Sequence, residues 1–212
     1  MRRTLLFPVA ATFFVGCGLT FVDPVRFPAR YEPQGGKFDA VPACASIRAV
    51  RAFDERADLG AGKRVLESDP TQQGSISMDG DARVMLYQAA YHAFELAALP
   101  VNRQSKTELK LSLVSVRIVE KAGGALSGYD GDLVLDAAVV DTATHQAIWE
   151  ARKSGHGHNA GAVGSEVNFQ ETVNRALEDA LGALLRDAEF ARVLCNPEGA
   201  SAKTSSSLPG SG

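Results

Sequence analysis

The chain reads LKLSLVSVRIV over residues 109–119, LVLDAAVVD over 133–141 and QAIWEARKSG over 146–155. Apolar and polar residues alternate in these runs, which is typical of strands that bury one face of an antiparallel sheet. In the first run the apolar parity changes between Leu113 and Val114. We therefore expect a β-bulge there, which would keep the apolar residues on one face. The turn-forming run Asp-Thr-Ala-Thr at 141–144 joins the second strand to the third.

Two helices are expected on either side of these three strands. The first covers residues 81–99, with Asp79 or Asp81 as its cap and Pro100 ending it. The second begins at Asn168-Phe169-Gln170-Glu171, which resembles a capping box, and continues to about Phe190. Its buried stripe comprises Val173, Leu177, Leu181, Leu184, Leu185 and Ala188.

Short strands are also expected at 47–53 and 65–66, with loops at 54–62 and 68–79. The main order is strand, helix, three strands, helix. This order predicts an α+β fold, in which two helices pack on one face of a mixed, mainly antiparallel sheet of about four strands.

The N-terminus has the three parts of a secretion signal. Arg2 and Arg3 are followed by an apolar run from Leu5 to Val15, which is shorter than the roughly 20 residues of a spanning helix. Gly16 and Cys17 then form a box like that at which bacterial lipoproteins are cleaved, although Phe14 stands where leucine is usual. The alternative is an ordinary signal peptide with a fortuitous cysteine. We expect Cys17 to carry the lipid and, because Gly18 follows it, an outer-membrane anchor with the domain in the periplasm.

Four segments follow from composition: a signal peptide at 1–16, a Pro- and Gly-rich linker at 17–43, one periplasmic domain at 44–195 and a disordered Ser- and Gly-rich tail at 196–212. The full chain has a formal charge of −3, and loss of Arg2 and Arg3 makes it −5. A mildly acidic chain argues against a nucleic-acid partner.

Cys44 and Cys195 remain after processing, and in an oxidising compartment they predict a disulfide that joins the two ends of the domain. Two free thiols are the alternative.

Few residues suggest chemistry. His156 and His158 stand at i and i+2 on a strand, so both side chains point to the same side and could begin a metal site. Glu166 or His145 could complete such a site only through folding. The preferred interpretation is an exposed strand end, and no metal is predicted. Asp54, Glu55, Arg56 and Asp58 are read as a turn with solvated ion pairs rather than a catalytic carboxylate pair. Gly60-x-Gly62-Lys63 lacks the spacing of a phosphate loop. We interpret Trp149, Tyr87 and Tyr91 as packing residues.

Two motifs suggest a relationship. The chain resembles the YajG-like family of bacterial outer-membrane lipoproteins in two places. The first is Asp54-Glu55-Arg56, which follows the opening strand. The second is the closing helix Leu184-Leu185-Arg186-Asp187-Ala188-Glu189-Phe190-Ala191-Arg192-Val193-Leu194. Related architectures occur in the lipopolysaccharide-assembly lipoprotein and in auxiliary lipoproteins of lipid-transport ABC systems. The resemblance implies an α+β fold and no established enzymatic activity.

We therefore expect a non-enzymatic lipoprotein without catalytic residues or cofactors, attached to the membrane through a lipidated Cys17. Its role would be that of an adaptor or assembly module that binds an envelope protein, by strand addition at a sheet edge. The alternative is an auxiliary subunit that holds a lipid in an apolar groove between helices and sheet. A hydrolase is the third hypothesis, and no Gly-x-Ser-x-Gly motif supports it.

Overall fold

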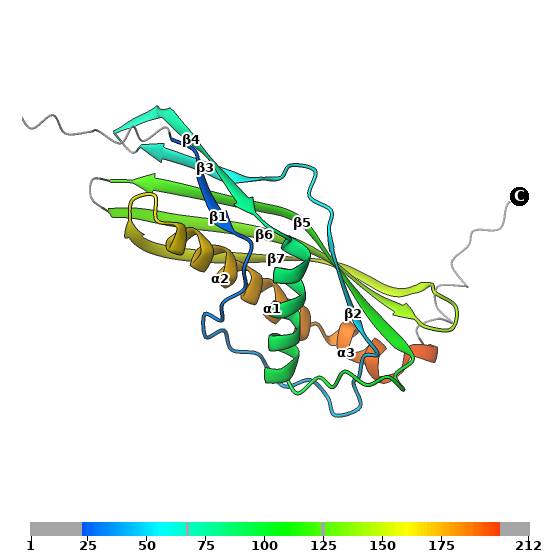
Figure 1. Ribbon diagram of the computed structural model, residues 1–212. Helices are drawn as coiled ribbons and strands as arrows, with labels where there is room; N and C mark the ends of the chain where they lie inside the picture. Colours follow the sequence, from blue (N-terminus) through cyan, green and yellow to red (C-terminus); the bar gives the residue numbers. More distant parts are fainter. Residues whose placement is uncertain (1–22, 67, 124–125, 200–212) are drawn as a thin grey trace, which may run out of the picture.

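Three strands of 16 residues each form the centre of the molecule: β5 (Thr107–Ala122), β6 (Leu126–Asp141) and β7 (Ala147–Ala162) (Figure 1). They are antiparallel neighbours in the order β5-β6-β7. The computed structural model describes residues 23–66, 68–123 and 126–199. The predicted signal peptide and Cys17 lie outside these residues, as does the predicted tail from residue 200 onward. Residues 197–199, which were expected to be part of that tail, are helical, and Glu198 pairs with Lys106.

The shorter strands extend this sheet beyond β5. They are β1 (Val25–Pro28), β2 (Val50–Asp54), β3 (Gly60–Leu66) and β4 (Asp69–Asp79). The sheet has seven strands in the order β1-β4-β3-β5-β6-β7, and β2 also pairs with β5. Pairs β1–β4, β2–β5 and β3–β5 are parallel, and the others are antiparallel. The sheet is thus mixed, as expected, but larger than the predicted four strands.

The strands missed by the sequence pattern are mostly polar. Strand β4 reads DPTQQGSISMD, and residues 68–79 were expected to be a loop because they lack a clear apolar alternation. Pairing with β3 on one side and β1 on the other holds this segment in the sheet, and Ile76 and Met78 supply its buried side chains. Long-range pairing has overridden the weak local preference here.

The predicted bulge in β5 is confirmed. The register with β6 shifts between Leu113 and Ser115, which makes Val114 the extra residue. Leu109, Leu111 and Leu113 before the bulge, and Val116 and Ile118 after it, are all buried, whereas Val114 is half-buried. The bulge therefore keeps one apolar face along the whole strand.

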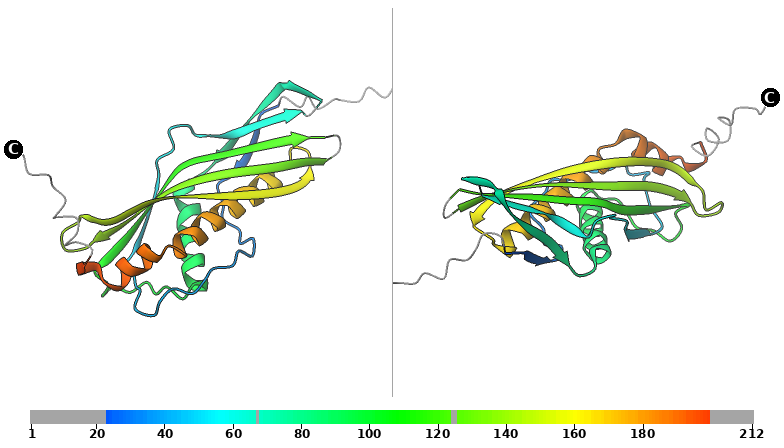
Figure 2. Two further views of the ribbon diagram at one scale, coloured as in Figure 1. Left: turned by 180° about the vertical axis from the view of Figure 1, so that it is seen from behind. Right: turned by 90° about the horizontal axis from the view of Figure 1, so that it is seen from above.

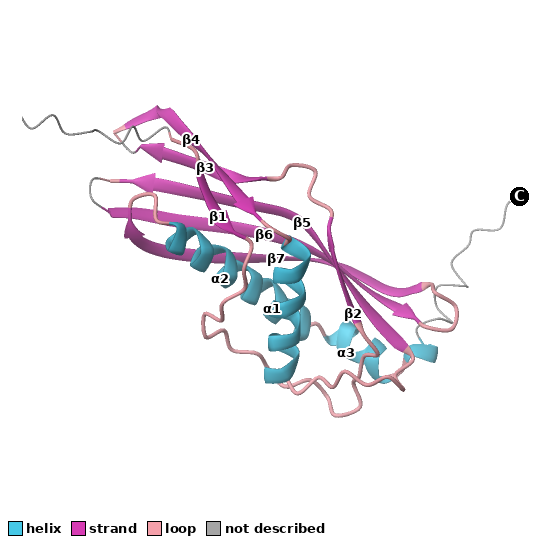
Figure 3. Cartoon of the chain, in the orientation of Figure 1, coloured by secondary structure: helices cyan, strands magenta, loops and turns pink. Residues whose placement is uncertain are grey.

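The helices are α1 (Ala82–Leu96), α2 (Glu166–Leu185) and α3 (Ala188–Cys195) (Figure 3). Both α1 and α2 lie on one face of the sheet, as predicted (Figure 2). Asp81 caps α1, but this helix buries Ala89, Ala90 and Ala93 rather than the tyrosines. The cap of α2 is Ser165, three residues before the expected one. The α2 stripe is buried as predicted up to Leu185, but the helix ends there and Ala188 is exposed.

The Pro- and Gly-rich stretch expected to be a linker contributes to the fold from residue 23 onward. Strand β1 pairs with β4, and Phe27 is only 1% exposed. Farther along, the Glu178 carboxylate of α2 accepts hydrogen bonds from the Gln34 amide (2.7 Å) and the Gly36 amide (2.8 Å). In a free linker the two backbone amides and the Phe27 ring would contact water, whereas here each has a partner within the fold.

Candidate interaction surface

The three long strands have an inner face, which packs on the helices, and an outer face, which no helix covers (Figure 2). Most inward-pointing side chains are apolar or small, with Glu120 of β5 and Lys153 of β7 as charged exceptions, whereas the outward-pointing residues of β6 and β7 include most of their charged and polar side chains. Among the described residues, no helix is long and apolar enough to span a membrane. The outer face is the candidate functional surface because its side chains are free to meet a partner.

The inner face of β7 is built from glycine. A Cβ at Gly155 would overlap the Ala176 carbonyl oxygen of α2, and one at Gly157 would overlap the Thr172 carbonyl oxygen. The backbone of α2 therefore lies directly against the strand. Ala180 continues the row of small residues on the helix, so this contact leaves no space between α2 and β7 for a lipid chain.

The outer face of the same segment carries the two predicted histidines. His156 Nδ1 lies 3.1 Å from Asp132 Oδ1, and His158 Nδ1 lies 2.8 Å from Asp130 Oδ1, each aspartate being the cross-strand neighbour on β6. The hydrogen bond from His158 holds the pKa of Asp130 below its usual range. Within residues 23–66, 68–123 and 126–199, no three His, Cys, Asp or Glu side chains are placed together to hold a metal ion. His145 lies in the β6–β7 turn and Glu166 in the first turn of α2, so neither joins the pair.

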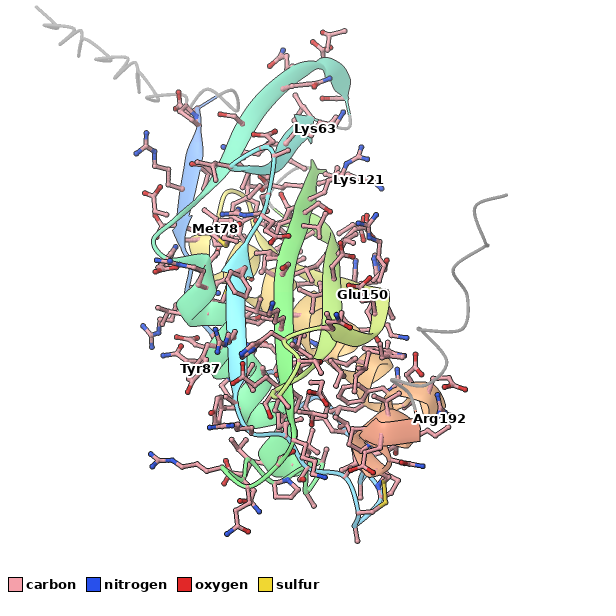
Figure 4. All side chains as sticks on the ribbon, turned by 90° about the vertical axis from the view of Figure 1, so that its right-hand side faces the viewer. Lys63, Met78, Tyr87, Lys121, Glu150 and Arg192 are labelled. Atoms are coloured by element: carbon pink, nitrogen blue, oxygen red, sulfur yellow. A yellow bond between two sulfur atoms is a disulfide. The ribbon has the colours of Figure 1, made fainter. Side chains whose placement is uncertain are left out.

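A shallow hollow of about 500 Å³ lies farther along the outer face. Ala138 lies in its middle, because the register places Lys110 of β5 and Glu150 of β7 on either side of this small residue. In the next row Arg152 donates two hydrogen bonds, each 2.7 Å, to the Asp136 carboxylate. These bonds lower the pKa of Asp136. Figure 4 labels Glu150 on this surface.

Lys110 and Glu150 differ from their neighbours in having no side-chain hydrogen bond or ion pair to any described residue. The arginine and histidines of β7 that face outward are paired with aspartates of β6. A cation and an anion thus lie on opposite sides of the hollow with water, rather than a protein group, as their partner. Sequence reasoning identified the wet face but not these two residues, since only the register of three strands places them in one row.

The acidic cluster at the end of β2 forms a turn. The Asp54 carboxylate accepts hydrogen bonds from Arg56 Nε (2.7 Å) and Nη2 (2.8 Å), which lower the pKa of Asp54. The Arg56 side chain is 3% exposed, so this ion pair is more buried than expected. Asp58 accepts a hydrogen bond from the Gly60 amide. Each of these carboxylates is therefore used in the turn itself.

Among the aromatic residues, Trp149 packs as predicted, and its ring centroid lies 5.3 Å from that of Phe190. On α1 the ring centroids of Tyr87 and Tyr91 are 4.5 Å apart. Tyr91 is half-buried and packs against the core as predicted, whereas Tyr87 is 43% exposed. Their hydrogen bond raises the pKa of Tyr91 to about 12. Together with Leu99 they border an apolar hollow of about 570 Å³, which forms a second open surface of the molecule.

Glu120 is a buried charge that the sequence did not indicate. Although it lies on β5 among exposed charged residues, its side chain is 0% exposed and receives Arg64 Nε at 2.5 Å. Its second oxygen accepts hydrogen bonds from Ser127 Oγ and the Gly164 amide. One carboxylate thus connects β3, β5 and β6 with the loop that leads into α2.

The predicted disulfide is present. Cys44, which precedes β2, is bonded to Cys195 at the end of α3, with 5.0 Å between their Cα atoms. The bridge closes a sequence separation of 151 residues. It therefore joins the segment before β2 to the end of α3, as the cysteine positions indicated.

No family model and no curated protein sequence matches this chain. Solved structures with a similar arrangement include a DUF330 protein from Xanthomonas campestris, with 14% identity, a TM-score of 0.43 and coverage of 86% of this chain and 97% of that one. Another is a putative lipoprotein from Caulobacter crescentus, with 14% identity, a TM-score of 0.40 and coverage of 56% and 86%. Lipoprotein GNA1162 from Neisseria meningitidis has 13% identity, a TM-score of 0.26 and coverage of 54% and 84%. These values assign neither family nor function, and the YajG-like resemblance is not confirmed.

Proposed function

We propose that this protein is a lipid-anchored envelope adaptor, non-enzymatic, that binds a protein partner through the outer face of its sheet. The observation that carries the proposal is the pair of solvated, opposite charges, Lys110 and Glu150, on either side of the hollow around Ala138. A partner that offers one acidic and one basic group can satisfy both. The lipoprotein box at Cys17 supplies the anchor, and we place it in the outer membrane.

The chemistry of the hollow favours a protein over a lipid as its occupant. Its border contains Lys110, Ser112, Asp136, Glu150 and Arg152, all of which hydrogen bond or carry charge. An acyl chain would desolvate these groups without pairing them, which is costly. A polar protein surface can replace the water that they lose and fix its register through the two opposite charges.

Strand addition is less suited to β7 than the sequence indicated. This strand is an edge of the sheet, but some of the backbone amides on its free edge already donate hydrogen bonds to side chains. The His156 amide donates to Asp179 of α2 (3.0 Å), and the Ala160 amide donates to Asn159 (2.8 Å). Such side chains block the pairing of a foreign strand. We therefore place the partner on the sheet face rather than on this edge.

Photocrosslinking tests the proposal. A photoreactive phenylalanine analogue is placed at Ser112, beside the hollow, or at Ala188 on α3 as a matched small, non-hollow position. We expect one recurrent envelope-protein adduct from Ser112 and none from Ala188. Adding Lys110→Glu should lower the yield about tenfold, the effect of losing roughly 1.4 kcal/mol of binding free energy. Equal adducts at the two positions, or a yield insensitive to Lys110→Glu, would contradict the proposal.

A second candidate function is the binding of a lipid beside α1. The hollow bordered by Tyr87, Tyr91 and Leu99 is mainly apolar and has one acidic residue, Glu95, in its lining, whereas four charged side chains line the hollow on the outer face. Val101 adds a partly exposed aliphatic side chain to it. Native mass spectrometry of protein released without detergent distinguishes the two, because co-purified lipid that is lost in Tyr87→Asp supports this candidate and its absence counts against it.

A further inference from the structure

Only five residues separate Cys17 from Asp23, the first described residue. Even fully extended, the six steps between their Cα atoms span no more than about 22 Å. Residues 24–43 cannot lengthen this connection, because β1 is paired within the sheet and the segment after it is held by Glu178. If Cys17 is in the membrane, the end of the domain that holds Asp23 is close to the lipid headgroups.

The position of Asp23 identifies that end. Its carbonyl oxygen accepts a hydrogen bond from Arg64 Nη1 (3.2 Å), and Arg64 is paired with the buried Glu120. Glu120 in turn accepts from the Gly164 amide, just before α2. The described chain therefore begins where β5 ends, β6 begins and α2 begins. Figures 1 and 2 show these segments together at one end of an elongated domain, with α3 and the β6–β7 turn at the other.

The surface at this end, which we call the anchor end, is defined by Lys121, Leu126 and Val167. Leu126 is 67% exposed and Val167 is 63% exposed, although both are large apolar residues. The Lys121 side chain is 56% exposed and makes only a long ion pair, 3.4 Å, with Asp130. Figure 4 shows Lys121 and Lys63 at this end, and Arg192 at the other. Exposed aliphatic side chains beside lysines suit a bilayer interface, where each lysine keeps its ammonium group among the headgroups.

We propose that the anchor end lies against the lipid headgroups of the membrane that holds Cys17, with Leu126 and Val167 facing the lipid. This orientation rests on the proposed function only through the lipidation of Cys17. A strand of 16 residues is about 50 Å long, so the central strands carry the β6–β7 turn and α3 away from the membrane. The hollow between Lys110 and Glu150 then faces sideways into the periplasm.

Fluorescence quenching in vesicles tests the orientation. Protein expressed with residues 1–16 and purified from the membrane fraction is reconstituted in phosphatidylethanolamine with a minority of phosphatidylglycerol and of a lipid that carries a doxyl quencher near its headgroup. A dye is attached to Leu126→Cys or Val167→Cys at the anchor end, or to Thr144→Cys in the β6–β7 turn as the control. Cys44 and Cys195 are bonded to each other and Cys17 is acylated, so the introduced cysteine is the free thiol.

We expect the dyes at positions 126 and 167 to lose most of their fluorescence and the dye at position 144 to lose none. Vesicle flotation of the same samples distinguishes the lipidation of Cys17 from the orientation of the domain. Protein that floats with an unquenched anchor end, or with equal quenching at position 144, overturns the orientation and leaves the anchoring intact. Protein that does not float overturns the lipidation of Cys17 and the orientation with it.

Discussion

Strand β7 has two faces made of alternate residues of one short segment, and they differ in nearly every property. Inward, Gly155 and Gly157 have no side chain and touch the backbone of α2. Outward, His156 and His158 reach aspartates on β6 and remain largely in water, at 59% and 63% exposed. The inner contact fixes the position of a helix, whereas the outer pairs occupy a surface that stays open. We therefore expect stability to depend on the inner face and partner binding on the outer one.

The largest effect should come from filling the inner contact. In Gly155→Val the new side chain meets the Ala176 carbonyl oxygen and the Ala180 amide, so α2 must move away from the sheet. We expect a loss of about 4 kcal/mol or more in the free energy of unfolding. Ser154→Val, the adjacent outward position, should change it by no more than about 0.5 kcal/mol. Urea unfolding measures both, and similar losses would show that the two faces do not differ in this way.

A smaller loss is expected from Glu120, a fully buried charge on the inner face. Glu120→Gln keeps the shape of the side chain but removes the buried negative charge that pairs with Arg64, and we expect a cost of about 3 kcal/mol. Lys121→Gln, one residue further along β5 but facing outward, should cost less than about 1 kcal/mol. Thermal unfolding at neutral pH compares the pair. A cost for Glu120→Gln as small as that for Lys121→Gln would mean that the buried network does not hold this end of the sheet.

The smallest effect should come from the outer ladder and should depend on pH. The pKa of Asp136 is lowered by its bonds to Arg152, so the ionised carboxylate contributes stability above the unfolded value of about 3.9. This contribution is lost as the pH falls through the folded pKa. Because the side chain is 41% exposed, we expect Asp136→Asn to cost no more than about 1 kcal/mol at pH 7.

Denaturant titrations of the wild type and of Asp136→Asn at pH 7 and at pH 2 check this prediction. The difference between the two proteins should shrink toward zero in acid. A difference that stays constant, or that grows as the pH falls, would show that charge pairing with Arg152 is not its source.

The central sheet could be predicted from sequence because its signal is local and periodic. The alternation in β6 and β7 and the parity change at Val114 are written in consecutive residues, and the bulge follows from them. The α2 stripe from Val173 to Leu185 is of the same kind. Cysteine positions on either side of the domain were sufficient to anticipate the disulfide.

The remaining features depend on partners that are distant in sequence. Strands β1 and β4 show little alternation of apolar and polar residues. They form because the backbone of each supplies hydrogen-bond partners to the other. The segment after β1 appeared to be a tether because nothing local reveals that Glu178, more than 140 residues away, binds it. The hollow required the register of three strands to be known, since a shift of one residue would separate Lys110 from Glu150.

The bridge between Cys44 and Cys195 also links the chemical state of Cys44 to the presence of α3. Cys195 ends α3, so the bond cannot form until the chain has been made as far as residue 195. A chain that stops or is cut before residue 195 keeps Cys44 as an exposed, reactive thiol. In an oxidising compartment that thiol is open to mixed disulfides. Copies that lack α3 would thereby be chemically marked at Cys44, while copies that contain it carry no free sulfur at this position.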